Sequence, residues 1–309
     1  MHKLILTFDI EDFINPSAAY ALRIVLELLN KYRLRALFFI TGQMTEKLGN
    51  FPEVLDLFKN HEIGFHSSGH SIRPIILEYA DVESYQQAYL TSQERETARI
   101  NPLTGKLEGE GGIYSLQDLF NPKKIEAYRA PGMSWTPPHL EALADLGIRF
   151  DFSSNIATSE PVHFKAISFY PYTFIQHWAG SLSDYQTLLY SILRSKVAIF
   201  DLHPAVYVNR VMWDSIYYKG NPNTLQRIAE RPPKEVTSLF MRFEVLLRII
   251  RILHHNRLIE VDPHLGTSNK SLIVNEDDVQ KCYEASIRWP RKFFGYNPRF
   301  VLAHFKEFF

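Results

Sequence analysis

Short apolar runs alternate with helical patterns along the first half of the chain. Residues 4–8 (LILTF), 35–41 and 61–66 have the length and continuity of buried strands. Between them, residues 18–32 and 51–59 carry apolar side chains at helical spacing. This alternation is typical of parallel βαβ units, in which polar residues that follow the strands meet at one edge of the sheet. The pattern therefore predicts an α/β fold.

The second half continues in the same way with longer insertions. The predicted elements are a polar helix at 82–99, a helix at 137–146, strands at 148–152 and 197–202, a helix at 240–255 and a strand at 258–261. Residues 101–112 contain four glycines and a proline, so they predict a long loop, which either borders a substrate cleft or is a plain insertion. Because no repeat or linker divides the pattern, one barrel-like domain is the simplest organisation.

Composition excludes several classes of protein. The 309 residues are 46% hydrophobic, enough for a substantial core, and 34 basic residues balance 34 acidic ones. Zero formal net charge argues against nucleic-acid binding. A single cysteine, Cys282, excludes an internal disulfide and a cysteine zinc cage. The apolar run at the N-terminus is too short for a signal peptide and no run approaches the roughly 18–20 residues of a membrane span, so a cytoplasmic location is expected.

Three acids, Asp9, Glu11 and Asp12, directly follow the first apolar run. Burying carboxylates is costly unless a metal, a proton-transfer role or a cationic partner uses them. One should bind a metal and another should take a proton from the metal-bound water. Strand periodicity places Asp9 and Glu11 on one face, whereas a turn after Ile10 would bring in Asp12 instead. The alternative, that acids favour the dipole of the next helix, accounts for Asp12 better than for Asp9.

A histidine pair, His66 and His70, follows the third predicted strand in HSSGH. If the segment turns helical, a spacing of four places both imidazoles on one side. Two histidines and one carboxylate are a common set for a catalytic divalent metal, which keeps open positions for water and substrate. Surface or capping histidines are the alternative, but the position opposite an acidic strand end favours the metal.

Further candidates follow later strands. In AYRAPG, Arg129 would hold the base carboxylate ionised, unless it is a surface arginine before a proline turn. Gly132 would let backbone approach a substrate, and an amide nearby could face an oxyanion. His203, after VAIFDL, could protonate a leaving amine, unless it is a satisfied core histidine. Asp151 or Asp201 could orient it, and the sequence does not choose between them.

Taken in order, TFDIED, HSSGH, RAPG, DFSS and LHP resemble the motifs of the polysaccharide deacetylase family (carbohydrate esterase family 4, the chitooligosaccharide-deacetylase-like domain). The resemblance covers about residues 1–262. It implies an irregular, incomplete (β/α) barrel, similar to a TIM barrel, that removes acetyl groups from N-acetylated sugars. One position departs from the simplest family pattern. Ile10 stands where a metal-binding aspartate would directly follow the base, so Glu11 or Asp12 must be the ligand.

The resemblance also implies roles for single residues. Asp9 corresponds to the general base and Arg129 to the residue that holds it. His66 and His70 correspond to metal ligands. The implied cofactor is one divalent transition metal, with zinc expected first because the ligands are nitrogen and oxygen, and with nickel, cobalt or iron(II) as alternatives.

Three late residues complete the implied site. His203 corresponds to the general acid, Leu202 to a wall of the acetyl pocket, and Asp151 to the late-motif aspartate that tunes the acid. Residues 1–266 are thus expected to form the catalytic domain. Residues 267–309 are expected to be a C-terminal extension packed on it. The basic and aromatic stretch at 288–300 (RWPRKFFGYNPRF) could alternatively touch a membrane surface.

The predicted function is metal-dependent hydrolysis of an N-acetyl group on a sugar or a surface-polysaccharide precursor, with release of acetate. A second hypothesis is hydrolysis of a small non-sugar amide or cyclic imide, since some members of the broader family act on such substrates. A third, from a different class, is a non-catalytic glycan-binding scaffold with a degenerate metal site. The joint presence of the base, the histidine pair and the late histidine argues against the third.

Overall fold

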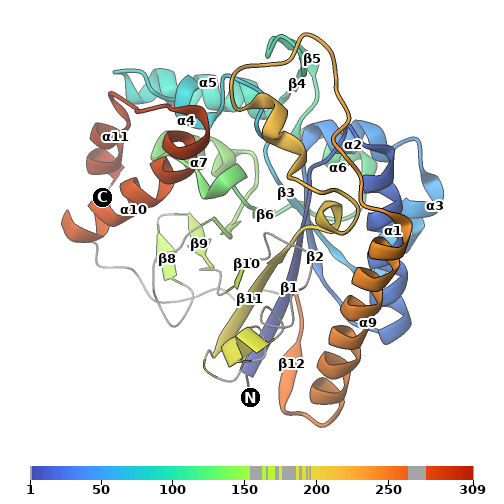
Figure 1. Cartoon of the computed structure of the whole chain (residues 1–309). Helices are drawn as coiled ribbons and strands as arrows, with labels where there is room; N and C mark the ends of the chain where they lie inside the picture. Colours follow the sequence, from blue (N-terminus) through green and yellow to red (C-terminus); the bar gives the residue numbers. More distant parts are fainter. Residues whose placement is uncertain are drawn as a thin grey trace.

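A curled, mostly parallel sheet forms the centre of the molecule (Figure 1). The computed structural model describes residues 2–153, 162–164, 166–170, 174–175, 186–187, 190–192, 194, 196–263 and 276–308. Ten strands form the sheet in the order β10-β11-β1-β2-β3-β6-β7-β9-β8, and β12 also pairs with β1. Their bounds are β1 (His2–Ile10), β2 (Leu37–Ile40), β3 (Glu62–Phe65), β6 (Ala127–Tyr128), β7 (Phe150–Asp151), β8 (Val162–Phe164), β9 (Ile167–Phe169), β10 (Phe174–Ile175), β11 (Val197–Leu202) and β12 (Ile259–Val261).

Helices cover the outside of this sheet. The α-helices are α1 (Pro16–Tyr32), α2 (Gly42–Leu48), α3 (Pro52–Leu55), α4 (Ile76–Tyr79), α5 (Tyr85–Glu96), α6 (Ile113–Leu119), α7 (Pro137–Asp145), α9 (Pro233–His255), α10 (Glu276–Trp289) and α11 (Val301–Phe308). The 3-10 turns are η1 (Asp56–Asn60), η2 (Pro131–Met133), η3 (Pro204–Tyr207) and η4 (Trp213–Tyr217), and the π-helical turn is η5 (Pro290–Phe294). Among the described strands, β10 and β8 form the two edges and do not pair with each other. The sequence prediction of an incomplete (β/α) barrel is thus confirmed.

The two faces of β1 have different environments because successive side chains of a strand alternate. Leu6 and Phe8 enter a large core that includes side chains of α1 and α9, and the Phe8 ring lies 6.2 Å from that of Phe243. Ile5 points to the opposite face, into a small apolar cluster inside the barrel. The inner face is therefore apolar at the start of β1. It becomes polar toward the carboxyl end of the strand, where Asp9 follows.

The element boundaries differ from the sequence prediction mainly in the insertions. Residues 101–112 are not a simple loop, because β4 (Ala98–Ile100) and β5 (Leu107–Glu110) pair antiparallel around its first part. The polar helix predicted at 82–99 is α5, which ends at Glu96. The last long helix, α9, begins seven residues before the predicted Phe240, at Pro233, a favoured residue type at a helix start.

The C-terminal helices α10 and α11 lie against the barrel beside α5 and α7 (Figure 1). The ring of Phe305 is 5.0 Å from that of Trp135, and the Ser134 hydroxyl donates to the Ser286 carbonyl at 2.6 Å. Asp81 accepts the Tyr296 hydroxyl at 2.6 Å and backbone N–H groups at the start of α11. The predicted boundary between residues 266 and 267 lies outside the described residues, so the domain division stays a prediction.

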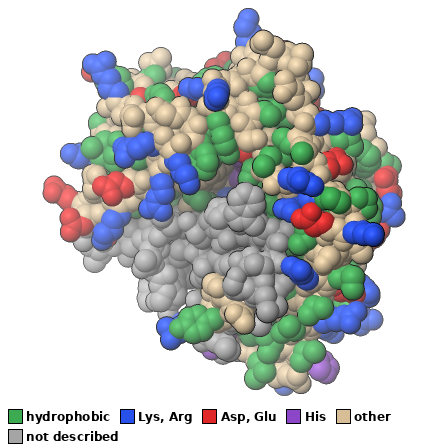
Figure 2. All heavy atoms as spheres, viewed as in Figure 1, with side chains coloured by type: hydrophobic (Ala, Val, Ile, Leu, Met, Phe, Trp, Pro, Cys, Tyr) green, Lys and Arg blue, Asp and Glu red, His purple; other side chains and the backbone are tan. Residues whose placement is uncertain are grey.

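The surface mixes charge signs. Figure 2 shows basic, acidic and hydrophobic side chains interspersed over one face, in agreement with the balance of 34 basic and 34 acidic residues. None of the helices in the described ranges combines the length and apolar character needed to cross a membrane.

Candidate active site

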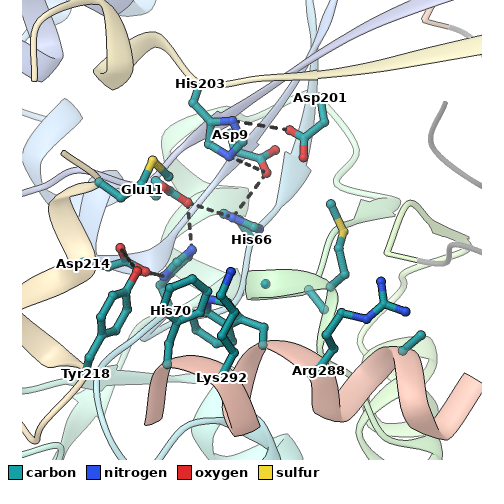
Figure 3. Close-up of a pocket in the computed structure, with 17 residues that line it drawn as sticks. Asp9, Glu11, His66, His70, Asp201, His203, Asp214, Tyr218, Arg288 and Lys292 are labelled. Carbon is teal, nitrogen blue, oxygen red and sulfur yellow. Dashed lines mark hydrogen bonds and ion pairs between the residues drawn. The ribbon is translucent and has the colours of Figure 1, made fainter. Parts of the chain in front are cut away.

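Glu11, His66 and His70 form a buried cluster at the carboxyl end of the sheet (Figure 3). The Nε2 atoms of His66 and His70 lie 3.2 Å and 2.7 Å from Glu11 Oε2. Burial would raise the pKa of Glu11, but the two histidines outweigh it and hold that pKa well below its usual range. Glu11 is therefore an ionised carboxylate that faces two imidazole nitrogens.

The histidine pair is presented by a loop, not by a helix. Residues 66–75 follow β3 without helical structure, and Ser67 and His70 have positive φ angles of 64° and 46°. The helical turn that would have placed both imidazoles on one side does not form, but both rings still face one carboxylate. His66 Nδ1 lies 2.7 Å from the Arg129 carbonyl, and His70 Nδ1 lies 2.7 Å from the Ser71 hydroxyl. A proton on each Nδ1 would leave both Nε2 atoms free to bind a metal.

Glu96, at the end of α5, anchors this loop and was not identified from the sequence. Its carboxylate accepts the Ser67 hydroxyl at 2.9 Å and the Ser68 backbone N–H at 2.8 Å, and it lies 2.9 Å from His139 Nε2. These partners lower the pKa of Glu96 although burial raises it. The sequence carries no clear signal for this role. The helix is polar, so its periodicity does not show that Glu96 is buried.

A second buried cluster combines Asp9, Arg129, Asp201 and His203. Arg129 Nη1 donates to Asp9 Oδ1 at 2.7 Å and to Asp201 Oδ1 at 2.9 Å, while Nη2 donates to the Thr7 hydroxyl at 2.8 Å. His203 lies with Nε2 3.7 Å from Asp9 Oδ2 and Nδ1 3.9 Å from Asp201 Oδ1. Parallel pairing of β1 with β11, which aligns Thr7 with Asp201, brings these residues together from opposite halves of the chain.

The local surroundings shift the pKa values of Asp9, Asp201 and His203 in different directions. Burial raises the pKa of Asp9, but Arg129, His66 and His203 outweigh it and lower the pKa overall. Burial, reinforced by Asp9, raises the pKa of Asp201 to about 7 despite Arg129. Burial lowers the pKa of His203, yet the nearby carboxylates outweigh it and raise the pKa overall. Asp9 is thus suited to accept a proton and His203 to carry one.

Asp12, the alternative metal ligand, lies outside the first cluster. Its Oδ1 accepts the backbone N–H groups of Ile14 and Asn15, both at 3.0 Å. Its Oδ2 accepts the side-chain amides of Asn15 at 2.9 Å and Asn209 at 2.7 Å. These bonds hold the turn between β1 and α1. Of the two carboxylates that the sequence left open, the structure thus places Glu11 beside the histidines and Asp12 in the turn.

Two other predicted residues occupy different positions from those expected. Asp151 accepts the backbone N–H and hydroxyl of Ser153 at 2.9 Å and 2.8 Å, and the Ser153 hydroxyl accepts the Ala130 N–H. The carboxylate 3.9 Å from His203 is instead Asp201. Leu202 points into the large outer core, since strand alternation places it opposite Asp201, and it is not among the residues that line the pocket described next.

Both clusters open into one pocket with a volume of about 290 Å³. One wall comes from the C-terminal segment, whose Ala285, Arg288, Trp289, Lys292 and Phe293 line it (Figure 3). Gly132 lines it too, with a φ of +56°, and a Cβ there would lie 2.1 Å from the Trp289 ring. The glycine predicted for a close backbone approach thus also makes room for a tail side chain.

The first cluster fits a divalent metal and the second does not. Glu11, His66 and His70 each offer one ligand atom, and these atoms lie within 4.8 Å of one another. Two imidazoles and one carboxylate suit zinc and related ions. Asp9, Asp201 and His203 satisfy the same distance, but the Arg129 guanidinium already binds both carboxylates. A cation is thus built into the second cluster, and a metal there would be repelled.

Comparison with known proteins agrees with the motifs. The polysaccharide deacetylase family model matches residues 2–150. Among solved structures, a carbohydrate esterase family 4 esterase from Streptococcus mutans is 17% identical, with 83% of each chain covered and a TM-score of 0.45. A family 4 carbohydrate esterase from Streptomyces lividans, in complex with acetate, is 13% identical over 88% of this chain and 98% of that one, with a TM-score of 0.43.

A family 4 pseudoenzyme from Bacillus anthracis is also similar, at 15% identity over 65% of this chain and 54% of that one, with a TM-score of 0.39. No curated protein matches the chain. The first-strand acids, the histidine pair and Arg129 lie inside the region that the family model matches, whereas His203 lies beyond it. Residues 2–150 therefore match the polysaccharide deacetylase family, the family that the motifs of the sequence resemble.

Proposed function

We propose that the protein is a metal-dependent hydrolase that removes an N-acetyl group from a sugar or a surface-polysaccharide precursor and releases acetate. The observation that carries this proposal is the adjacency of the two clusters in one pocket. Asp9 Oδ2 lies 3.6 Å from His66 Nε2, so a proton acceptor stands directly beside a candidate metal ligand. General acid, general base and metal ligands are the parts that amide hydrolysis requires.

Glu11, His66 and His70 would hold the metal. A divalent ion bound there would polarise the acetamide carbonyl and lower the pKa of water. Zinc is the ion we propose first, because the ligands are two nitrogens and one oxygen. Hydrogen bonds to Arg129 O and Ser71 Oγ would keep both imidazoles oriented.

The chain's own groups would move the protons. Asp9, kept ionised by Arg129, would take a proton from the attacking water as the bond between water oxygen and carbonyl carbon forms. Backbone near Gly132 would face the developing oxyanion. His203 would donate a proton to the sugar nitrogen as the C–N bond breaks, so that acetate and an amino sugar leave. We assign the orientation of His203 to Asp201.

Metal analysis joined to an acetate assay tests the proposal. The full chain, purified without chelator and loaded with zinc, should hold one equivalent and release acetate from N-acetylated sugars. His66→Ala and His70→Ala should each lose the metal. Asp9→Asn should keep the metal but lose activity by roughly 10²–10⁴-fold, the range for a general base. A wild type that stays metal-free after zinc loading would contradict the mechanism.

The same assay separates the other two hypotheses. Turnover of a cyclic imide with no acetate from any acetamido sugar would favour the second. Glycan binding by a metal-free, inactive wild type would favour the third. The cytoplasmic location stays a prediction, which fractionation of the native cells would test.

A further inference from the structure

One face of the C-terminal segment is turned toward the pocket. The residues of that face follow helical spacing, and they are Ala285, Arg288, Trp289, Lys292 and Phe293. Figure 3 shows Arg288 and Lys292 projecting from this segment toward the space in front of the two clusters. The same pocket is lined by the carboxylates of Asp9, Glu11, Asp201 and Asp214, which Figure 3 shows above this segment. Two basic side chains therefore stand opposite the reaction centre in the same pocket.

These two cations have no anionic partner among the described residues. No ion pair or side-chain hydrogen bond of the described residues includes Arg288 or Lys292, and both are exposed. Other basic side chains of the segment are engaged, since Lys281 Nζ lies 3.5 Å from Asp278 and Arg291 Nε donates to Asn297 at 2.8 Å. Like charges four residues apart on a helix repel each other, so this arrangement is unfavourable without a counter-ion.

A helix dipole explains only part of this arrangement. Cations at the end of α10 are favoured by the dipole, whichever side of the helix they occupy. The dipole does not account for the placement of Arg288 and Lys292 at the pocket, since Arg291 of the same turn does not line it. Lys292 Nζ also lies 4.9 Å from the centre of the Phe293 ring, which leaves its charge without an anionic partner among the described residues. The apolar rings beside them, Trp289 and Phe293, suit the face of a sugar ring.

We propose that Arg288 and Lys292 form a subsite for an anionic group, a phosphate ester or a carboxylate, carried by the acetamido sugar. This inference rests on the proposed function and narrows its substrate class to anionic acetamido sugars. With the acetamide at Glu11, His66 and His70, the sugar ring would lie along the rings of the tail and its anion would meet the two cations. Charged hydrogen bonds of this kind discriminate strongly when both partners are held in place.

Substrate discrimination by the zinc-loaded full chain tests the subsite. We would measure kcat/KM for acetate release from N-acetylglucosamine, N-acetylglucosamine 1-phosphate and N-acetylmuramic acid. In the double variant Arg288→Gln/Lys292→Gln, the preference for the anionic over the neutral sugar should fall on the order of tenfold. Arg291→Gln, a charge change on the same turn but outside the pocket, should keep both activity and preference.

Each outcome decides the proposal. A loss of preference confined to the phosphate sugar identifies a phosphate subsite, and one confined to the muramic acid identifies a carboxylate subsite. Equal preference in wild type and double variant overturns the inference while the deacetylase function stands. If no sugar releases acetate, the proposed function fails and calorimetry with N-acetylglucosamine 1-phosphate still tests the subsite. Weaker binding by the double variant then supports the subsite, and equal binding overturns it.

Discussion

Two clusters of histidine and carboxylate lie side by side at the carboxyl end of the sheet. They differ in the groups that compensate the negative charge of their carboxylates. In the first, Glu11 faces His66 and His70. In the second, a buried guanidinium lies between Asp9 and Asp201, although the potential donor atoms of Asp9, Asp201 and His203 also lie within 4.8 Å of one another. Donor spacing within this limit therefore does not by itself distinguish a cluster that could hold a metal. The distinguishing feature is the cation that the chain already supplies to the second cluster.

The difference has a structural cause in the strands. Arg129 follows β6 and is fully buried, with its guanidinium 4.5 Å from the centre of the Phe39 ring. It reaches β1 and β11 across the inside of the barrel. Glu11, which lies after β1, is beyond that reach and meets the loop that follows β3 instead. One arginine thus separates two neighbouring acids, Asp9, the proposed general base, and Glu11, the candidate metal ligand.

The largest effect should come from removing that arginine. Arg129→Met leaves Asp9 and Asp201 buried without their shared cation, so we expect the free energy of unfolding to fall by about 3–5 kcal/mol. Urea denaturation of both proteins measures the change. Arg227→Met, at an exposed site, should unfold like the wild type. Equal stability of Arg129→Met and wild type would show that the second cluster does not depend on its built-in cation.

An intermediate effect should separate the two acids that the sequence left open. Glu11→Gln removes the carboxylate between the histidines, so we expect zinc affinity to fall on the order of a hundredfold or more. Competition with a chelating dye measures the affinity. Asp12→Asn should bind zinc like the wild type, because Asp12 only holds the turn before α1. Loss of zinc in Asp12→Asn alone would reverse the assignment.

The smallest effect should come from Glu96, which supports the loop that carries the two histidines. The loss of stability on its substitution should depend on pH. The folded-state pKa of Glu96 lies below the ordinary glutamate value of 4.5, so its ionised form stabilises the fold above that pH. This contribution disappears as the pH falls through the lower folded-state pKa. We expect Glu96→Gln to cost about 1–3 kcal/mol at neutral pH and less in acid.

Denaturation at several pH values measures this loss, with Glu94→Gln as the control. Glu94 lies on the same helix and is exposed, so its variant should follow the wild type at every pH. A penalty for Glu96→Gln that is constant with pH would mean that its shape, rather than its charge, supports the loop.

Features that depend on neighbouring residues in the sequence could be predicted, and features that depend on tertiary contacts could not. The strand β1 and its acids were readable because a strand alternates with period two and buried acids are costly. For the segment that carries His66 and His70, the spacing of four only indicated how a helix would bring the two rings together. In the structure, a backbone with positive φ at Ser67 and His70 brings the two rings together instead. The residue types of this segment do not predict that backbone conformation.

The sequence by itself determined the α/β class, the strand ends at which the candidate chemistry lies, and most of the polar residues that meet there, although it missed Glu96. Each of these depends on short-range periodicity and on the cost of burying charge. Only the tertiary structure decided that Glu11 rather than Asp12 meets the histidines, that Asp201 rather than Asp151 lies beside His203, and that the tail lines the pocket. Those choices depend on strand pairing and helix docking between residues far apart in the chain, and local sequence patterns do not encode such distances.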